Sequence, residues 1–244
     1  MRLTRIHVPQ PLATVAEVAL PEAAAGHVVR VLRLRPGDRL MLFDGSGADF
    51  HAEITEIAGP RVCARILERV DGLRESPLAV TLVQAVSRGE RMDWTLQKAT
   101  ELGVRRIQPV LAARSVVRLD EQQGERRLRH WQAVVASACE QCGRSVLPHV
   151  EAPLELPRYL ERPYGDVRRL VLAPDGDVPI GSLAGGLTGV ELLIGPEGGL
   201  DEAELAASLR AGFEAVRLGP RVLRTETAGI AALAVLQALA GDLG

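Results

Sequence analysis

The sequence predicts an α/β protein that carries a small β-rich unit at its N-terminus. From Pro77 onward, apolar strand-like segments alternate with amphipathic helical segments, which is the pattern of a parallel sheet covered by helices. Before Asp71, strand-like segments follow one another and are joined by turn signals. The stretch Asp71–Pro77 is polar and rich in turn formers, so we place a domain boundary between residues 72 and 73.

The N-terminal domain, residues 1–72, is expected to begin with a helix and to continue with a β-hairpin. Pro36 and Gly37 stop the helix. The tetrapeptide Asp44-Gly45-Ser46-Gly47 has the composition of a hairpin turn, and Gly59-Pro60 breaks the chain before a third strand. The expected elements are a helix over Ala24–Leu34 and strands over Arg39–Phe43, Phe50–Ile57 and Arg61–Val70.

The C-terminal domain, residues 73–244, is expected to alternate strands with helices. Gly103 closes the first helix, and Asp201 with Glu204 has the spacing of a capping box at the third. Thr225 is expected to be the N-cap of the last helix. The expected strands are Leu78–Val86, Arg106–Leu111, Leu147–Val150, Arg168–Ala173, Val190–Ile194 and Ala215–Leu218. The expected helices are Met92–Leu102, Glu125–Cys142, Asp201–Ala211 and Thr225–Ala240.

Composition and charge exclude several classes of protein. Hydrophobic residues make up 47% and charged residues 25% of the chain, a mixture typical of globular rather than disordered proteins. The longest apolar run, Ala228–Ala240, is too short to span a bilayer, and Met1–Pro11 lacks the apolar core of a signal peptide. A net charge of −2 argues against a protein that coats nucleic acid non-specifically. We therefore expect a cytoplasmic enzyme or binding protein with no membrane partner.

The three cysteines, Cys63, Cys139 and Cys142, are too few and odd in number for the disulfide framework of a secreted protein. Cys139 and Cys142 have the C-x-x-C spacing of a redox pair or of half a zinc site. This pair lies in an expected helix and the sequence holds no second such pair. We therefore favour a packing role for both residues and expect no bound metal.

Two glycine-rich segments follow the last two expected strands. Gly195–Leu200 and Leu218–Ala228 each lead from a strand into a helix. Glycines let the backbone approach a ligand closely, and the start of a helix offers free N–H groups. Open α/β sheets bind ligands at the carboxyl ends of their strands. Neither segment has the spacing of a Walker phosphate loop or of a dinucleotide-binding motif. Each segment alone fits a tight connection between a strand and a helix, but two such segments in succession predict a small-ligand site.

These segments resemble the knot loops of the SPOUT methyltransferases, RNA-modifying enzymes whose chain threads a trefoil knot around S-adenosylmethionine. Leu193-Ile-Gly-Pro-Glu-Gly-Gly-Leu200 and Leu218-Gly-Pro-Arg-Val-Leu-Arg-Thr-Glu-Thr-Ala228 are similar to the two loops of the bacterial 16S rRNA uridine-N3 methyltransferases. Serine is commoner in that family where Cys142 stands here. Further stretches that resemble the family are Lys98–Val104, Ile107–Pro109 and Glu140–Arg144, and His27–Asp44 resembles its PUA-like barrel.

The resemblance implies both a fold and an activity. The implied fold is a PUA-like β-barrel, expected to bind RNA, followed by a SPOUT α/β domain with a deep trefoil knot. The implied activity is methylation, with S-adenosylmethionine as cofactor, of N3 of one uridine in the decoding region of 16S rRNA in the small ribosomal subunit. A homodimer is implied as well. The implied cofactor-binding residues are Leu172, Ala173, Ile194, Gly195, Glu197, Gly198, Gly199, Leu218, Gly219, Val222, Leu223, Thr225 and Ala228.

Three charged side chains in these loops are candidates for the chemistry. Methylation of N3 requires the nitrogen to lose its proton and to align with the methyl group. Arg224 is expected to stabilise the developing uridine anion, and Glu226 or Glu197 to accept the proton or to position the base. Two structural alternatives remain open. Arg224 and Glu226 can pair to brace the loop, and Glu197 can cap local N–H groups.

RNA contacts are expected from arginine-rich surfaces. Lys98 is the single lysine of the chain, and arginine binds phosphate and stacks on bases better than lysine does. The expected RNA contacts are Arg5, Arg30, Arg33, Arg88, Arg91, Lys98 and Arg144. Two other functions remain open: methylation of the 2′-oxygen of a ribose in tRNA or rRNA, and a non-catalytic role in ribosome assembly. The first usually has an Asn- and Ser-containing motif where Thr225-Glu-Thr-Ala228 stands here.

Overall fold

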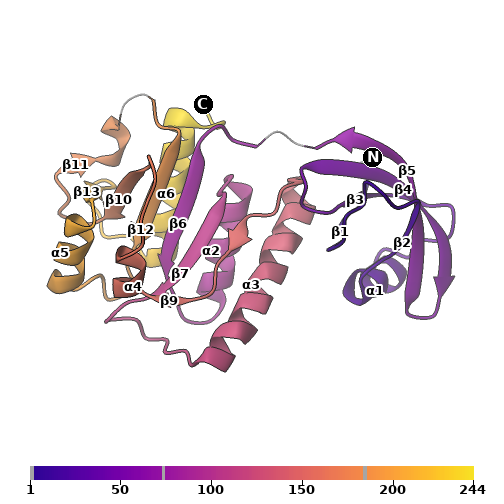
Figure 1. The fold of residues 1–244 in the computed structure, drawn as a ribbon, viewed down its shortest axis with the longest axis horizontal. Helices are drawn as coiled ribbons and strands as arrows, with labels where there is room; N and C mark the ends of the chain where they lie inside the picture. Colours follow the sequence, from indigo (N-terminus) through magenta and orange to yellow (C-terminus); the bar gives the residue numbers. More distant parts are fainter. Residues whose placement is uncertain (1–2, 73–74, 184–185) are drawn as a thin grey trace. The chain divides into compact units, whose positions relative to one another are not determined.

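A computed structural model describes residues 3–72, 75–183 and 186–244 of the chain (Figure 1). The chain forms two compact units. Unit 1 consists of Met1–Glu75 together with Ala136–Leu147, and unit 2 consists of Ser76–Val135 and Pro148–Gly244. The domain boundary predicted after residue 72 does not account for the segment 136–147. This segment lies far along the sequence but belongs to unit 1.

Unit 1 is built on a five-stranded sheet in the order β1-β3-β4-β5-β2. The sheet is antiparallel except that β1 pairs parallel with β3. Phe50, Leu42 and Ile54 point into its core and are almost wholly buried. The elements are β1 (Arg5–His7), β2 (Glu17–Ala19), α1 (Glu22–Arg30), β3 (Arg39–Phe43), β4 (Ala48–Ala58) and β5 (Arg61–Asp71).

The two strands of the predicted hairpin, β3 and β4, are confirmed. Strands β1 and β2 and the end of helix α1 differ from the prediction. The three-residue strands β1 and β2 are too short to show an alternating pattern and were not predicted. The helix predicted to reach Leu34 ends at Arg30, because the chain turns before Pro36 and Arg33 adopts a left-handed φ of 56°.

Unit 2 contains an eight-stranded sheet whose strands all pair in parallel. Its order is β11-β13-β10-β12-β6-β7-β8, and the short strand β9 also pairs with β7. The strands are β6 (Ala79–Ala85), β7 (Arg106–Leu111), β8 (His149–Val150), β9 (Leu154–Glu155), β10 (Arg168–Leu172), β11 (Val178–Pro179), β12 (Gly189–Ile194) and β13 (Phe213–Arg217). The predicted parallel sheet is therefore confirmed, and β9 and β11 are the pairs of residues that the sequence pattern missed.

Helices follow most strands of this sheet. They are α2 (Glu90–Glu101), α3 (Glu121–Cys142), α4 (Leu156–Leu160), α5 (Glu202–Arg210) and α6 (Thr225–Ala240), together with a short 3₁₀ helix, η1 (Ile180–Ser182). The predicted capping box is present at α5, where the Asp201 side chain accepts from Glu204 N and the Glu204 side chain accepts from Asp201 N. Among the described residues, no helix is both long enough and apolar enough to cross a membrane.

The last helix returns across the sheet. Strand β13 lies on the far side of β10, yet α6 contacts β12, β6 and α2 (Figure 1). Close contact is possible because Gly229 has no side chain. A Cβ atom at this position would lie 3.1 Å from Oε1 of Gln84 and 3.5 Å from Ile194. The path of the chain brings the start of α6 to the carboxyl ends of the strands.

Candidate functional site

A cavity of about 320 Å³ opens at the carboxyl ends of β13, β10 and β12, which are neighbours in the sheet. Each of these strands leads directly into a segment of the cavity wall: Leu172–Pro174 after β10, Ile194–Leu200 after β12 and Leu218–Leu223 after β13. This volume lies near the lower end of the range for small-molecule sites. The topology of the sheet therefore assembles one site from segments that are far apart in the sequence.

The glycines of the two loops are required by the geometry of the backbone. A Cβ atom at Gly195 would lie 3.1 Å from the backbone nitrogen of Leu200, closer than real Cβ contacts normally come. Gly199 and Gly219 both have a φ of 71°, a left-handed conformation that side-chain-bearing residues adopt at a cost. The cavity wall is consequently bare backbone at these positions.

Thr225 joins three elements at the base of the cavity. Its hydroxyl donates to the Gly195 carbonyl oxygen at 2.6 Å and accepts from Nε2 of Gln84, on β6, at 3.0 Å. The prediction that Thr225 is the N-cap of α6 is wrong. The N-cap is Arg224, without a side-chain cap, and the buried hydroxyl of Thr225 bonds to the neighbouring strands instead.

All of the residues predicted to bind the cofactor line this cavity: Leu172, Ala173, Ile194, Gly195, Glu197, Gly198, Gly199, Leu218, Gly219, Val222, Leu223, Thr225 and Ala228. Their role in binding remains a prediction. Arg114, which was not predicted from the sequence, also lines the cavity and donates from Nη1 to the Gly198 carbonyl at 3.1 Å. Arg114 follows β7, so its position after another strand was the signal that could have identified it.

The two candidate carboxylates share one arginine. Arg91 Nη1 donates to Oε1 of Glu197 at 3.3 Å, and Arg91 Nε lies 3.9 Å from Oε1 of Glu226. The Glu226 side chain is only 14% exposed, and its Oε2 is buried without a hydrogen-bond partner among the described residues. The exposed Arg224 forms no ion pair within those residues. The alternative in which Arg224 and Glu226 brace each other is therefore not observed.

A second groove lies at the starts of α2 and α6. Glu90, Arg91 and Trp94 from α2 face Arg224, Glu226 and Thr227 across it. Trp94 is a functional candidate that was not predicted from the sequence, because an aromatic residue in an amphipathic helix is usually part of the core. In the structure this residue is 42% exposed.

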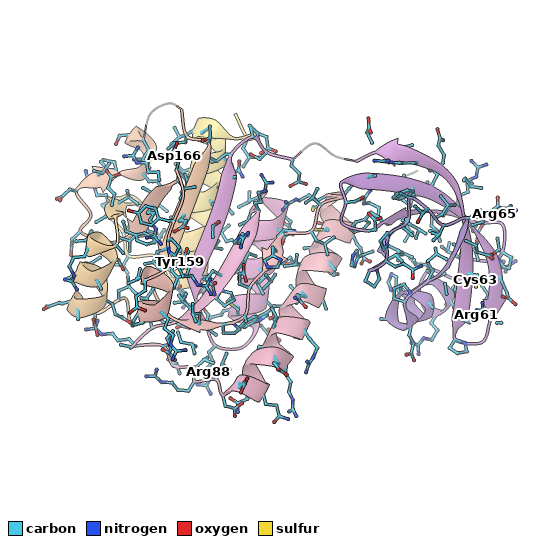
Figure 2. All side chains as sticks on the ribbon, in the orientation of Figure 1. Arg61, Cys63, Arg65, Arg88, Tyr159 and Asp166 are labelled. Atoms are coloured by element: carbon cyan, nitrogen blue, oxygen red, sulfur yellow. The ribbon has the colours of Figure 1, made fainter. Side chains whose placement is uncertain are left out.

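The predicted RNA contacts fall into two groups. Arg30 and Arg88 are exposed, and Figure 2 labels Arg88 in the loop between β6 and α2. Lys98 pairs with Glu101 at 2.8 Å but remains partly exposed. Arg33 is exposed as well, and Arg91 lines the groove described above.

Arg5 and Arg144 require a correction, because both are structural residues of unit 1. Arg5 forms a bidentate pair with Asp49 at 2.5 and 2.9 Å, and its side chain is 8% exposed. Arg144 pairs with Glu75 and is 5% exposed. A guanidinium group held in a buried ion pair is not available to phosphate, and the removal of one partner leaves a buried charge.

The C-x-x-C pair lies at the end of α3. Cys139 and Cys142 are free, and burial raises the pKa of the Cys139 thiol to about 12, which keeps it protonated at neutral pH. Within residues 3–72, 75–183 and 186–244, no group of three or more His, Cys, Asp or Glu side chains is arranged to hold a metal ion.

Both parts of the chain match known families of RNA methyltransferase domains. Residues 74–237 match the RNA methyltransferase domain family, and residues 20–67 match the RNA methyltransferase PUA domain family. The Ribosomal RNA small subunit methyltransferase E of Buchnera aphidicola (subsp. Schizaphis graminum) is 34% identical over 242 residues, which are 99% of this chain and 98% of that protein. The protein of the same name from Mycobacterium tuberculosis is 37% identical over 87% of this chain and 83% of its own length.

Solved structures extend the likeness to the fold. The Ribosomal RNA small subunit methyltransferase E of Neisseria gonorrhoeae, bound to S-adenosylmethionine, has a TM-score of 0.91 and 39% identity over the full length of both chains. A Legionella pneumophila protein solved with bound SAM has a TM-score of 0.92 and 38% identity, again over both full chains. The conserved fold, the loops at its strand ends and these matches show that the chain belongs to the ribosomal RNA small subunit methyltransferase E family.

Proposed function

We propose that this enzyme transfers a methyl group from S-adenosylmethionine to N3 of one uridine of 16S rRNA, uridine-1498 in the standard rRNA numbering. The observation that carries the proposal is the cavity at the ends of β13, β10 and β12, with the carboxylates of Glu197 and Glu226 beside it. Family membership supports an S-adenosylmethionine-dependent rRNA methyltransferase. The identity of the methylated base and of the methylated atom goes beyond family membership and is proposed here.

The residues around the cavity fit the methyl donor. Leu172, Ile194 and Leu223 supply an apolar wall of the kind that holds an adenine ring. The loops at Gly195–Gly199 and Leu218–Leu223 supply backbone that can approach the ligand, because no Cβ stands in the way at the glycines. When bound, the donor supplies an electrophilic methyl group, and the remaining chemistry falls to side chains of the protein.

We infer that Glu226 accepts the N3 proton. Its side chain lines the groove, and its Oε2 has no hydrogen-bond partner among the described residues, so the carboxylate has an unused acceptor that a small rotation brings to a substrate donor. The N3–H bond of uracil lies in the ring plane, in the direction along which the methyl group must arrive. The proton therefore leaves before the methyl group approaches. Glu197 holds Arg91 between the two carboxylates and thereby positions it.

Arg224 is the proposed stabiliser of the uridine anion. Loss of the N3 proton places negative charge on O2 and O4 of the base, and a guanidinium group can donate to such an oxygen. Arg224 is exposed at the groove and forms no ion pair with the described residues. Its charge is consequently available to the substrate.

RNA binding is proposed for both parts of the chain. We propose that residues 1–72, the PUA-like barrel, bind RNA, and that residues 73–244 form the knotted methyltransferase domain. The return of the chain from β13 across β10 to α6 supports the knot. Arg30, Arg33, Arg88, Arg91 and Lys98 remain the proposed RNA contacts, in the cytoplasm and within the small ribosomal subunit.

A homodimer is proposed from α6. This helix has apolar side chains that remain open on one chain, such as the 40% exposed Leu239, besides those that pack in the core. A second copy can bury such a surface. Sedimentation of the purified protein measures its mass directly.

The decisive experiment is mass spectrometry of small-subunit rRNA from a strain that lacks this gene. We expect the loss of one 3-methyluridine and its return when the wild-type gene is restored, but not when the Glu226→Gln variant is restored. Persistence of 3-methyluridine would refute the substrate. Loss of a 2′-O-methyl group instead would indicate the ribose enzyme, and an unchanged rRNA would indicate a non-catalytic assembly factor.

A further inference from the structure

The groove beside the cofactor cavity has a volume of about 440 Å³. Strand β6 is the neighbour of β12 in the sheet, so the start of α2, which follows β6, meets the start of α6 at the same edge as the cavity. We propose that this groove is the acceptor site, in which the target uracil stacks on the indole ring of Trp94. The inference rests on the proposed function, because it assigns the RNA base to the place next to the methyl donor.

Trp94 is placed as a stacking platform. The chain contains two tryptophans, of which Trp131 is 1% exposed in the core and Trp94 is 42% exposed on α2. On its other face the same helix buries Met92 and Leu96, so the core is complete without Trp94. An exposed indole offers an aromatic face on which a base can stack, and such stacking contributes substantially to the binding of single-stranded RNA.

The charged groups of the groove match the edge of uracil. Along that edge uracil presents the acceptor O4, the donor N3–H and the acceptor O2. The groove contains the donors Arg91 and Arg224 and the acceptor Glu226, whose Oε2 is buried without a partner in the described parts of the chain. Cytosine presents an acceptor at N3 and a donor at N4, so it would set an acceptor against Glu226. The groove therefore favours uracil over cytosine.

Arg91 connects this groove to the cofactor cavity. It lies 3.3 Å from Glu197, which lines the cavity, and 3.9 Å from Glu226, which lines the groove. A base whose N3–H donates to Glu226 is therefore at the boundary between the two sites. Stacking on Trp94 would hold the plane of that base while the proton leaves and the methyl group arrives.

The test compares Trp94→Leu, which removes the aromatic face, with Trp94→Phe, which keeps one. The full-length proteins are assayed with S-adenosylmethionine and small subunits that lack the methyl group. We expect kcat/KM for the RNA to fall about tenfold to a hundredfold in the Leu variant and by no more than roughly threefold in the Phe variant. The Kd for S-adenosylmethionine, measured by calorimetry, should be unchanged in both.

A second readout does not depend on activity. In a Trp131→Phe background, Trp94 is the single tryptophan, and its fluorescence should be quenched by a synthetic RNA that contains the target uridine. The same RNA with an abasic site at that position should leave the fluorescence almost unchanged. If the Trp131→Phe protein does not fold, the difference between wild-type and Trp94→Phe fluorescence gives the same signal.

Three results would overturn the inference. The first is a Trp94→Leu variant with wild-type kcat/KM, and the second is equal quenching by the abasic RNA. The third is a loss of activity that accompanies a changed sedimentation coefficient, which would place Trp94 in a contact between subunits. Failure of the proposed function is distinguishable, because the wild-type enzyme would then form no 3-methyluridine in the same assay.

Discussion

Thr225 shows how one hydroxyl group can organise a binding site. It bonds to the Gly195 carbonyl after β12 and to the Gln84 side chain on β6, while its own backbone begins α6. Both partners lie at the carboxyl ends of the strands. The position of the glycine loop in the cofactor cavity therefore depends on this residue.

We predict that Thr225→Val weakens both stability and cofactor binding. Valine has the same shape but no hydroxyl, so the Gly195 carbonyl loses its donor and the buried Gln84 amide loses an acceptor. Leaving a buried donor or acceptor without a partner costs about 1–3 kcal/mol. Urea denaturation should show a lower free energy of unfolding, and calorimetry a weaker Kd for S-adenosylmethionine. Thr225→Ser keeps the hydroxyl and is the control; equal behaviour of the Val and Ser variants would contradict the prediction.

Glu140, on the part of α3 that belongs to unit 1, gives a prediction for pH dependence. Burial raises the pKa of its carboxyl above the ordinary 4.5, although the carboxylate accepts from the backbone N–H of His7 at 2.9 Å. Because the folded-state pKa is raised, the stability from this group is present below the unfolded-state value and is lost as pH rises through the folded-state value.

Glu140→Gln should therefore be more stable than the wild type at neutral pH, since the amide oxygen can still accept from His7 and carries no charge to bury. The advantage should vanish in acid, where the wild-type carboxyl is protonated. Thermal denaturation at a series of pH values measures both effects. The control is Glu125→Gln on the same helix, where the side chain is 63% exposed and stability should change little. A constant difference at all pH values would exclude this explanation.

The strand-to-helix loops of unit 2 differ from its helices in what they require of glycine. Gly199 has a left-handed φ of 71°, and Gly124, inside α3, does not have a positive φ. A Cβ atom would have no neighbour within 4 Å at either position. The backbone conformation alone therefore decides the effect of adding a methyl group.

We predict opposite effects of alanine at these two glycines. Gly199→Ala should lower the free energy of unfolding by about 1–2 kcal/mol, because a Cβ is strained in the left-handed region. Gly124→Ala should raise it by about 0.5–1 kcal/mol, because alanine restricts the unfolded chain and favours the helix. Chemical denaturation of both variants checks the signs, and a loss of stability in both would show that space rather than φ decides.

Unit 1 is assembled from two distant segments of the chain. In the segment Ala136–Leu147, the Glu140 carboxylate accepts from the backbone N–H of His7. The Ser145 hydroxyl donates to Asp49 at 2.6 Å, and Val146 forms an isolated β-bridge with Ser46. Arg144 pairs with Glu75 from the other end of the unit. These contacts make the segment part of the core structure of unit 1.

We predict that residues 1–75 alone do not fold cooperatively, because Asp49, Glu75 and the His7 N–H lose partners. Joining residues 136–147 to this fragment through a flexible linker of about 12 glycines and serines should restore a cooperative thermal transition. Circular dichroism and the dispersion of amide NMR signals measure the result. A well-folded 1–75 fragment would show that the second segment is dispensable.

The net charge of −2 means that RNA binding must depend on a few local cationic side chains. The loss of one such contact should therefore be visible in the salt dependence of binding. If Arg88 binds a phosphate, Arg88→Gln should reduce the slope of log K against log salt concentration by about 0.7–1. The slope of an Arg210→Gln variant, altered at an exposed arginine at the end of α5, should remain that of the wild type. Filter binding to the rRNA fragment at several salt concentrations gives the slopes, and equal slopes would remove Arg88 from the contacts.

The sequence by itself determined the features that depend on local patterns. Strands β3 and β7 and helix α6 begin and end where the alternation of apolar residues and the glycine and proline signals predict. The capping box at Asp201 was equally visible, because it depends on residues only three apart. The two glycine loops could be assigned to a shared site, since consecutive strands of a parallel sheet end at the same edge.

The tertiary structure decided everything that depends on contacts between distant residues. It removed Arg5 and Arg144 from the surface by pairing them with Asp49 and Glu75. It also turned Thr225 from an expected cap into a link between strands. It also placed Trp94 opposite Glu226, although the two lie on different helices. The physical reason is that burial and ion pairing belong to pairs of residues, whereas the periodicity of a sequence reports one segment at a time.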